Sequence, residues 1–200
     1  MTRPLAVLFA LAFALPAAAQ HHSGHSGADG ITEAFTVAGL RVDEAAPPAG
    51  SGVGRAGLRF DDGGYVSIVH GKPYRRGRSI FGGVVEVGAV WAGGAHRATE
   101  LFTTVPLMLG GTHIPAGAYS LFVTPGERFW KLHLNTRLGM HLADEYDPAE
   151  DLATYEVPAT VLTEPVDGLT WSFETDSGLA LRLAWDRLAA EWPFHAVQPE

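Results

Sequence analysis

Apolar and polar residues alternate one by one along much of this chain, which is the pattern of a β-strand with one buried face. The clearest case is residues 169–173, where Leu, Trp and Phe alternate with Thr and Ser. A turn sequence, Asp-Ser-Gly at residues 176–178, follows, and the alternation resumes over residues 179–185. Two alternating segments joined by a turn predict an antiparallel hairpin.

The same alternation predicts most of the remaining chain to be strands joined by tight turns. The 24 glycines and 13 prolines among 200 residues supply the turns. Helix is expected only as a turn or two after Asp147, a helix-capping residue followed by Pro148. The expected fold is all-β: a single antiparallel β-sandwich or jelly-roll-like domain with little helix. Further strands are expected at residues 34–42, 65–70, 97–104, 107–109, 112–114, 119–124, 128–135, 154–162 and 190–195.

The first 19 residues have the pattern of a cleavable secretory signal. Arg3 precedes an apolar run from Leu5 to Leu15, and Ala17 and Ala19 are the small residues that a signal peptidase requires. The apolar run is shorter than the roughly 20 residues needed to cross a membrane. We therefore expect export to a periplasm or to the exterior, with no membrane span after cleavage.

The rest of the chain divides into a tail and one domain. Residues 20–30 are rich in Ser, Gly and His and lack large apolar groups, so a flexible tail is expected. Residues 31–200 are expected to form the single β-sandwich domain. There is no cysteine, and the net charge is −8, which disfavours nucleic acid as a partner. The sequence does not indicate an oligomeric state.

After cleavage, the tail would place a histidine at the third position of the chain. Gln20, His21 and His22 would then offer the terminal amine, two backbone amides and an imidazole, a square-planar nitrogen set that suits Cu(II) or Ni(II). Cyclisation of the N-terminal Gln would remove the amine. The alternative is a linker that carries histidines without binding metal.

Three arginines crowd the segment after the strand predicted at residues 65–70. Arg75, Arg76 and Arg78 could orient an anionic ligand, because guanidinium groups bind carboxylates and phosphates in a bidentate manner. The alternative is that Arg78 ties down the glycine-rich segment that follows, while the other two arginines are solvated.

A second set of candidates brackets the Gly-Gly-Ala sequence at residues 93–95. A Trp face beside polar groups is a common arrangement for holding a sugar. The alternative is a buried Trp that closes one end of the sandwich. The set comprises Trp91, His96, Arg97, Thr99 and Glu100.

His133 lies on the opposite strand face from Trp130 and Leu132, where it is either an ordinary surface histidine or a base. A small hydrolase or isomerase would use His133 or His96 as the base and Glu100 or Asp144 as the orienting acid. The five histidines from residue 70 to residue 141 show no metal-binding spacing, and the sequence has no nucleophilic serine motif.

Two further segments are distinctive: KPYRRGRSIFGGVVEVGAVWAGGAHRAT at residues 72–99 and IPAGAYSLFVTPGERFW at residues 114–130. Together they resemble the bacterial exported family known as domain of unknown function 2911. The resemblance covers about residues 50–195 and implies no activity, cofactor or catalytic residue. Where the family usually continues after the Trp with Arg, Thr, Gly, Ala and Asn, this chain has Ala92, Gly93, Gly94, Ala95 and His96.

Together these features favour a non-enzymatic binding or structural module for a small or carbohydrate-like ligand, with no cofactor. The loops that carry Trp91 and the three arginines would form its ligand surface. The hydrolase or isomerase is the alternative, and it requires His96, His133, His141, Glu100 and Asp144 to converge in one pocket.

Overall fold

The structure is a computed structural model that describes the backbone of residues 31–38 and all of residues 49–197. In this part of the chain, every strand pair within the two sheets is antiparallel. The strands are β1 (Ile31–Ala38), β2 (Gly52–Phe60), β3 (Tyr65–Lys72), β4 (Thr99–Thr103), β5 (Leu107–Leu109), β6 (Thr112–Ile114), β7 (Gly117–Pro125), β8 (Phe129–Asn135), β9 (Asp151–Pro158), β10 (Thr160–Glu174) and β11 (Ala180–Ala196).

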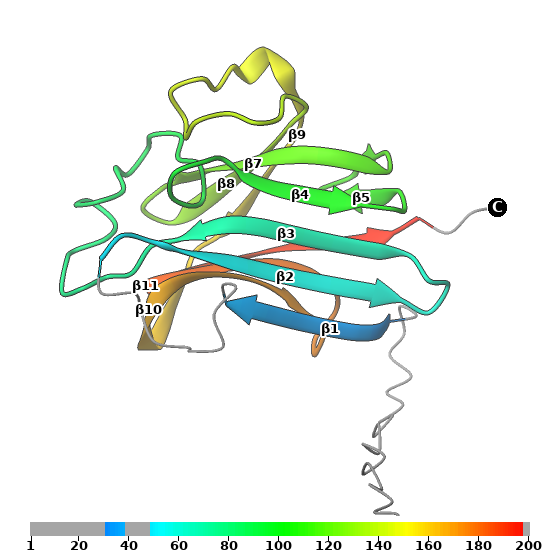
Figure 1. The fold of residues 1–200 in the computed structure, drawn as a ribbon, viewed down its shortest axis with the longest axis horizontal. Helices are drawn as coiled ribbons and strands as arrows, with labels where there is room; N and C mark the ends of the chain where they lie inside the picture. Colours follow the sequence, from blue (N-terminus) through cyan, green and yellow to red (C-terminus); the bar gives the residue numbers. More distant parts are fainter. Residues whose placement is uncertain (1–30, 39–48, 198–200) are drawn as a thin grey trace, which may run out of the picture.

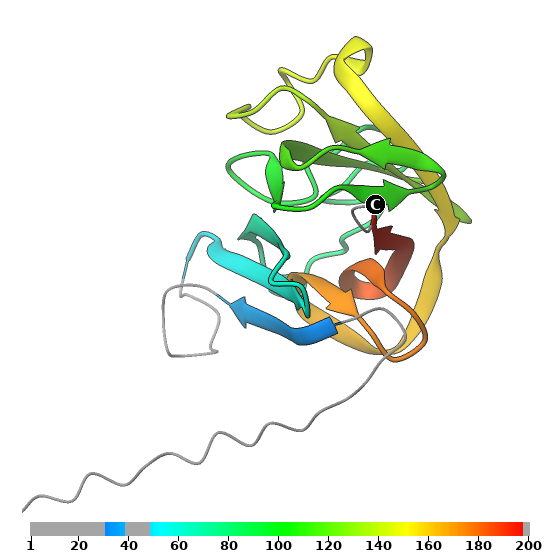
Figure 2. The same ribbon diagram turned by 90° about the vertical axis from the view of Figure 1, so that its right-hand side faces the viewer.

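The strands form two sheets that face each other across the core. The larger sheet has the order β1-β2-β3-β4-β7-β8-β9, and the smaller has the order β10-β11-β5-β6 (Figure 1). Only Ala159 separates β9 from β10, so the chain passes from one sheet to the other almost without interruption. Figure 2 shows this passage as the yellow strand that bends toward the orange hairpin. The all-β sandwich expected from the sequence is confirmed.

Tryptophan dominates the core between the sheets. Trp130 on β8, Trp171 on β10, and Trp185 and Trp192 on β11 are all fully buried. Full burial of a Trp stabilises a protein by about 3–5 kcal/mol relative to Ala. The long hairpin of β10 and β11 therefore supplies three of the four buried tryptophans. Trp91, the remaining tryptophan of the chain, is only half-buried.

A second, smaller core covers part of the outer face of the larger sheet. Phe122, whose neighbours in β7 face the main core, is fully buried against Ala92, Ala98 and Met140. Met140 belongs to residues 136–147, the segment between β8 and the short helix η1 (Pro148–Glu150), at the top of Figure 1. This segment explains why polar groups on the outer face of β8 are also buried.

Most of the observed strands agree with the predicted ones, but β2 was not predicted, because Ala56, Gly57 and Leu58 are buried in succession and interrupt the alternation. β1 begins at Ile31, before the strand predicted at residues 34–42, and the segments predicted at residues 179–185 and 190–195 belong to one continuous strand, β11.

The segment predicted as a single strand over residues 154–162 belongs to two strands in different sheets, because the chain crosses between the sheets at Ala159. Alternation continues through this crossing and therefore gives no sign of it. The helical turn predicted after Asp147 is present as η1, and the Asp147 side chain accepts a hydrogen bond from the backbone NH of Ala149.

His70 is a buried polar residue on the inner face of β3, in line with Val66 and Ile68. Its ring lies over Gly54 on β2, where any Cβ would overlap the imidazole. Nδ1 donates to the Gly71 carbonyl at 3.0 Å, so this nitrogen carries the proton of the neutral ring. Burial lowers the pKa of His70 to about 4.

We predict that His70 makes the fold sensitive to acid. Its pKa is about 4 in the folded state, below the ordinary histidine value of 6.5 that applies in the unfolded state, so the unfolded state takes up the proton first as the pH falls. The contribution of neutral His70 is complete above pH 6.5 and declines progressively toward pH 4, by about 3 kcal/mol in total.

Urea unfolding of the wild type and of His70→Asn between pH 8 and pH 4 measures this effect. Asn retains a donor for the Gly71 carbonyl but does not titrate. The stability difference between the two proteins should shrink or reverse as the pH falls, whereas parallel pH profiles would contradict the prediction.

Candidate functional site

The connection from β3 to β4, residues 73–98, forms one end of the sandwich, at the left of Figure 1. It is tied to both sheets. Tyr74 forms a β-bridge with Gly168 of β10, and the backbone of Trp91 exchanges two hydrogen bonds of 2.8 Å with that of Val123 on β7. Although it is rich in glycine, the connection is anchored and presents its side chains in defined positions.

A groove of about 370 Å³ opens beside this connection. Apolar side chains form most of its lining, and they come from both halves of the connection and from Leu142 and Ala143 of the 136–147 segment. The polar side chains that line it are those of Ser51, Arg78 and His96. A mostly apolar cavity with a few polar groups, in this size range, is typical of small-molecule sites.

Trp91 is held rigidly in the groove by other aromatic rings. Its indole stacks on that of Trp185, with centroids 5.9 Å apart and planes 20° from parallel, and Phe81 meets it edge-on at 6.5 Å. Its Nε1 donates to the Gly94 carbonyl at 3.2 Å. Because Trp91 is half-buried, the structure gives it two roles: it closes the end of the core and also lines the groove.

A second hollow, of about 250 Å³, adjoins the groove on the outer face of β2, β3 and β4. Ser51, Ala95 and His96 line both spaces. Arg97 and Glu100 line the second hollow, so it contains two of the side chains that the sequence grouped with Trp91. Thr99, from the same group, is fully buried and contacts neither space.

His96 stands exposed at the junction of the two hollows with a backbone φ of +70°. This left-handed conformation costs an L-residue about 1–2 kcal/mol, so the surrounding structure must impose it. The neighbouring Ala95 backbone lies so close to Gly71 of β3 that a Cβ on Gly71 would overlap the Ala95 carbonyl. Contact with β3 therefore fixes the loop that carries His96.

We predict that Gly71→Ala displaces this loop. The added methyl group meets backbone rather than a flexible side chain, so relief requires movement of residues 93–96, at a cost of about 3 kcal/mol. Gly52→Ala on the paired strand is the matched control, because a Cβ there has its nearest neighbour at 3.7 Å. Urea unfolding of both variants measures the costs. Similar stability for the two variants would contradict the close approach.

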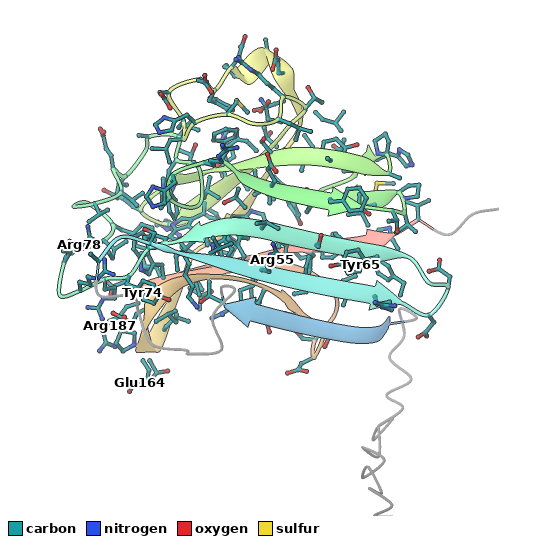
Figure 3. All side chains as sticks on the ribbon, viewed as in Figure 1. Arg55, Tyr65, Tyr74, Arg78, Glu164 and Arg187 are labelled. Carbon is teal, nitrogen blue, oxygen red and sulfur yellow. The ribbon has the colours of Figure 1, made fainter. Side chains whose placement is uncertain are left out.

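The three clustered arginines do not act as one site. Arg78 lines the groove, and its Nε and Nη2 donate to the backbone carbonyls of Arg75 and Tyr74 at 3.1 and 2.7 Å (Figure 3). Arg75 forms an ion pair with Asp186 at 2.9 Å, and Arg76 donates to the backbone carbonyl of Gly50 at 2.8 Å. Arg75 and Arg76 line neither the groove nor the second hollow. Only Arg78 therefore combines a structural tie with access to the groove.

His133 belongs to a separate buried cluster on the outer face of β7, β8 and β9. Its Nδ1 lies 3.0 Å from Oδ2 of Asp151, and its Nε2 lies 2.9 Å from the hydroxyl of Thr124. The Tyr146 hydroxyl donates to the same carboxylate oxygen at 2.6 Å, and Asn135 donates to the other at 3.0 Å. Burial lowers the pKa of His133 although Asp151 opposes the shift, so the ring is neutral at pH 7.

The order of hydroxyl, imidazole and carboxylate in this cluster is that of a nucleophilic triad. However, His133 is only 8% exposed, and Asp151 is already engaged by three donors. Burial and the hydrogen bond to Asp151 raise the pKa of Tyr146, which keeps its hydroxyl protonated as a donor. The cluster therefore ties the 136–147 segment, through Tyr146, to β8 and β9.

The five groups required by the hydrolase alternative do not converge. His96 and Glu100 share the second hollow, but Glu100 Oε1 accepts from the backbone NH of Gly139 at 3.3 Å. His141 pairs with Asp144 at 3.2 Å in an exposed position, and His133 pairs with Asp151. Sequence reasoning missed Asp151, Tyr146 and Ser51, because nothing local to these residues indicates their partners.

We predict that Tyr146→Phe destabilises the protein by about 1–3 kcal/mol, because the buried Asp151 carboxylate loses a donor. Tyr65→Phe is the matched control, since Tyr65 is half-exposed on the outer face of β3 and should change stability by no more than about 0.5 kcal/mol. Chemical unfolding compares the two. A loss no larger in Tyr146→Phe than in Tyr65→Phe would show that the cluster does not hold the segment.

Within residues 49–197, no group of three or more His, Asp or Glu side chains is arranged to hold a metal ion. The metal site predicted at Gln20, His21 and His22 lies outside the described residues, as do the signal and tail. Among the described residues, no helix is long and apolar enough to cross a membrane.

Fold and groove together define an antiparallel β-sandwich with a candidate ligand site at one end. A family model described as protein of unknown function (DUF2911) matches residues 58–194, from β2 to β11. The match spans more than half of the chain and contains both motif segments, so the chain belongs to this family. No curated protein and no solved structure matches the chain.

Proposed function

We propose that this protein is an exported binding module that holds a small, carbohydrate-like ligand in the groove beside Trp91. The observation that carries the proposal is the combination, in one groove, of a rigid indole with the polar side chains of Ser51, Arg78 and His96. Support for export comes from the signal pattern of residues 1–19.

The physical argument rests on the two faces of a sugar ring. A pyranose presents a patch of C–H groups, which packs on an aromatic face, and a rim of hydroxyls, which requires donors and acceptors. Trp91 supplies the aromatic face, and its stacking on Trp185 removes the entropy cost of fixing it on binding. Arg78 supplies donors, His96 supplies both donor and acceptor, and Ser51 adds a hydroxyl.

The test is a thermal-shift screen of the exported domain against monosaccharides, sugar acids and other small polar molecules. A ligand present at about 100 times its Kd stabilises the folded state by about 2.7 kcal/mol, which is a measurable rise in Tm. We expect the rise to be reduced in Trp91→Phe and in His96→Ala. Arg59→Ala, an exposed position of β2 outside both hollows, should leave it unchanged.

Trp91→Phe is preferred to Trp91→Ala because Trp91 also packs against the core. The larger truncation is expected to lower stability by up to about 3 kcal/mol before any effect on binding. A ligand that raises the Tm of wild type, Trp91→Phe and His96→Ala equally binds elsewhere and would contradict the proposal. A library in which nothing shifts the wild type would contradict it as well.

A further inference from the structure

The groove beside Trp91 and the hollow over β2, β3 and β4 adjoin each other at His96. Their volumes are about 370 and about 250 Å³, and the side chains of Ser51 and His96 border both. A ligand that is seated on Trp91 and extends past His96 would therefore reach the second hollow. A ligand that fills both spaces must be elongated.

The second hollow offers a mixture of apolar and charged side chains. Val53 on β2 and Val69 on β3 are each 41% exposed and lie on its floor. Arg97 and Glu100, both exposed, stand beside them. Glu100 accepts one hydrogen bond from Gly139, at 3.3 Å, and a carboxylate has room for further donors. The second hollow therefore has an apolar floor, a negatively charged acceptor in Glu100 and a positively charged donor in Arg97.

This chemistry discriminates among elongated ligands. A peptide strand would bind most simply at a free strand edge, but the strands under this hollow are already paired, Val53 with Gly71 and Val69 with Glu100. An acyl chain would leave the charged groups of Arg97 and Glu100 without partners where it covered them. An oligosaccharide, with apolar ring faces and hydroxyl rims repeated along its length, satisfies both kinds of side chain.

We propose that the ligand is an oligosaccharide that lies across His96, with one sugar on Trp91 and the following sugars over Val53 and Val69, where Arg97 and Glu100 hydrogen-bond their hydroxyls. This inference rests on the proposed function and deepens it, because it gives the ligand a minimum length. The Trp91 subsite supplies stacking, and the second subsite supplies charge-assisted hydrogen bonds.

The experiment begins with an array of neutral and acidic oligosaccharides of one to six units, probed with the exported protein. The best ligand is then titrated calorimetrically as a series of increasing length. Affinity should rise at least about tenfold between one unit and three, because the added sugars form hydrogen bonds with the charged groups of Arg97 and Glu100. The gain should be lost in Arg97→Ala and in Glu100→Gln.

Two controls keep the outcomes separate. Arg59→Ala removes an exposed arginine of the same sheet outside both hollows and should retain the full gain with length. Glu100→Gln keeps an acceptor for the Gly139 NH, so a loss of binding in this variant is not a loss of that contact. Both Arg97 and Glu100 are exposed, so their variants should fold normally.

Different experimental results would contradict the two proposals. Binding through Trp91 that does not strengthen with length, or that strengthens equally in Arg97→Ala, would overturn the second subsite and leave the small-ligand proposal standing. If no sugar on the array binds while a small non-sugar ligand raises the Tm of the wild type but not of Trp91→Phe, the proposal of an oligosaccharide ligand is wrong. If neither binds, both proposals fail.

Discussion

The close approach of residues 93–95 to both sheets is the constraint on which the candidate site depends. Gly93 lies against the indole of Trp171, which donates from Nε1 to the Gly93 carbonyl at 2.8 Å. The Ala95 backbone lies so close to Gly71 of β3 that there is no room for a Cβ on Gly71. Because the loop is held between a core tryptophan and a strand, His96 keeps a backbone conformation that it would not adopt alone.

The same tryptophans connect the stability of the core to the shape of the groove. Trp185 is fully buried, yet it also stacks on Trp91 and lines the groove. Protein interiors are densely packed, so the loss of the Trp185 side chain could not be accommodated locally. A substitution at Trp185 would therefore alter the core and the groove together. Binding is better probed at His96, Arg97 and Glu100, which are exposed and leave the core untouched.

The opposite wall of the groove depends on a different set of interactions. Leu142 and Ala143 reach the groove because the segment that carries them is tied down at both ends. At one end Ser120 donates to the Arg137 carbonyl at 2.7 Å, and at the other the Tyr146 hydroxyl donates to Asp151. Buried polar groups that are fully paired specify one arrangement of the chain. The His133 cluster thus positions a wall of the site without contacting a ligand.

Alternation along the chain predicted the sandwich and most of its strands, because one buried face per strand follows directly from the period of two. It did not predict β2, in which Ala56, Gly57 and Leu58 are buried in succession. It was not sufficient where a second layer covers the outer face. His133 and Asn135 alternate with core residues as surface positions should, but the 136–147 segment buries them. The groove was only partly predictable for the same reason. Trp91 and His96 are near in sequence, whereas Ser51 meets them only through the folded path of the chain.

The family pattern gains a physical meaning when it is placed on this geometry. Several motif residues serve the architecture: Tyr119 donates to the Pro115 carbonyl at 2.8 Å, and Ile80 is fully buried. Among residues 92–96 this chain differs from the expected pattern at three positions. Ala92 and His96 line the groove, and Gly93 packs against the indole of Trp171. Two of the three departures therefore change the lining of the candidate site. A shared scaffold with an altered lining accounts for a common fold without requiring a common ligand.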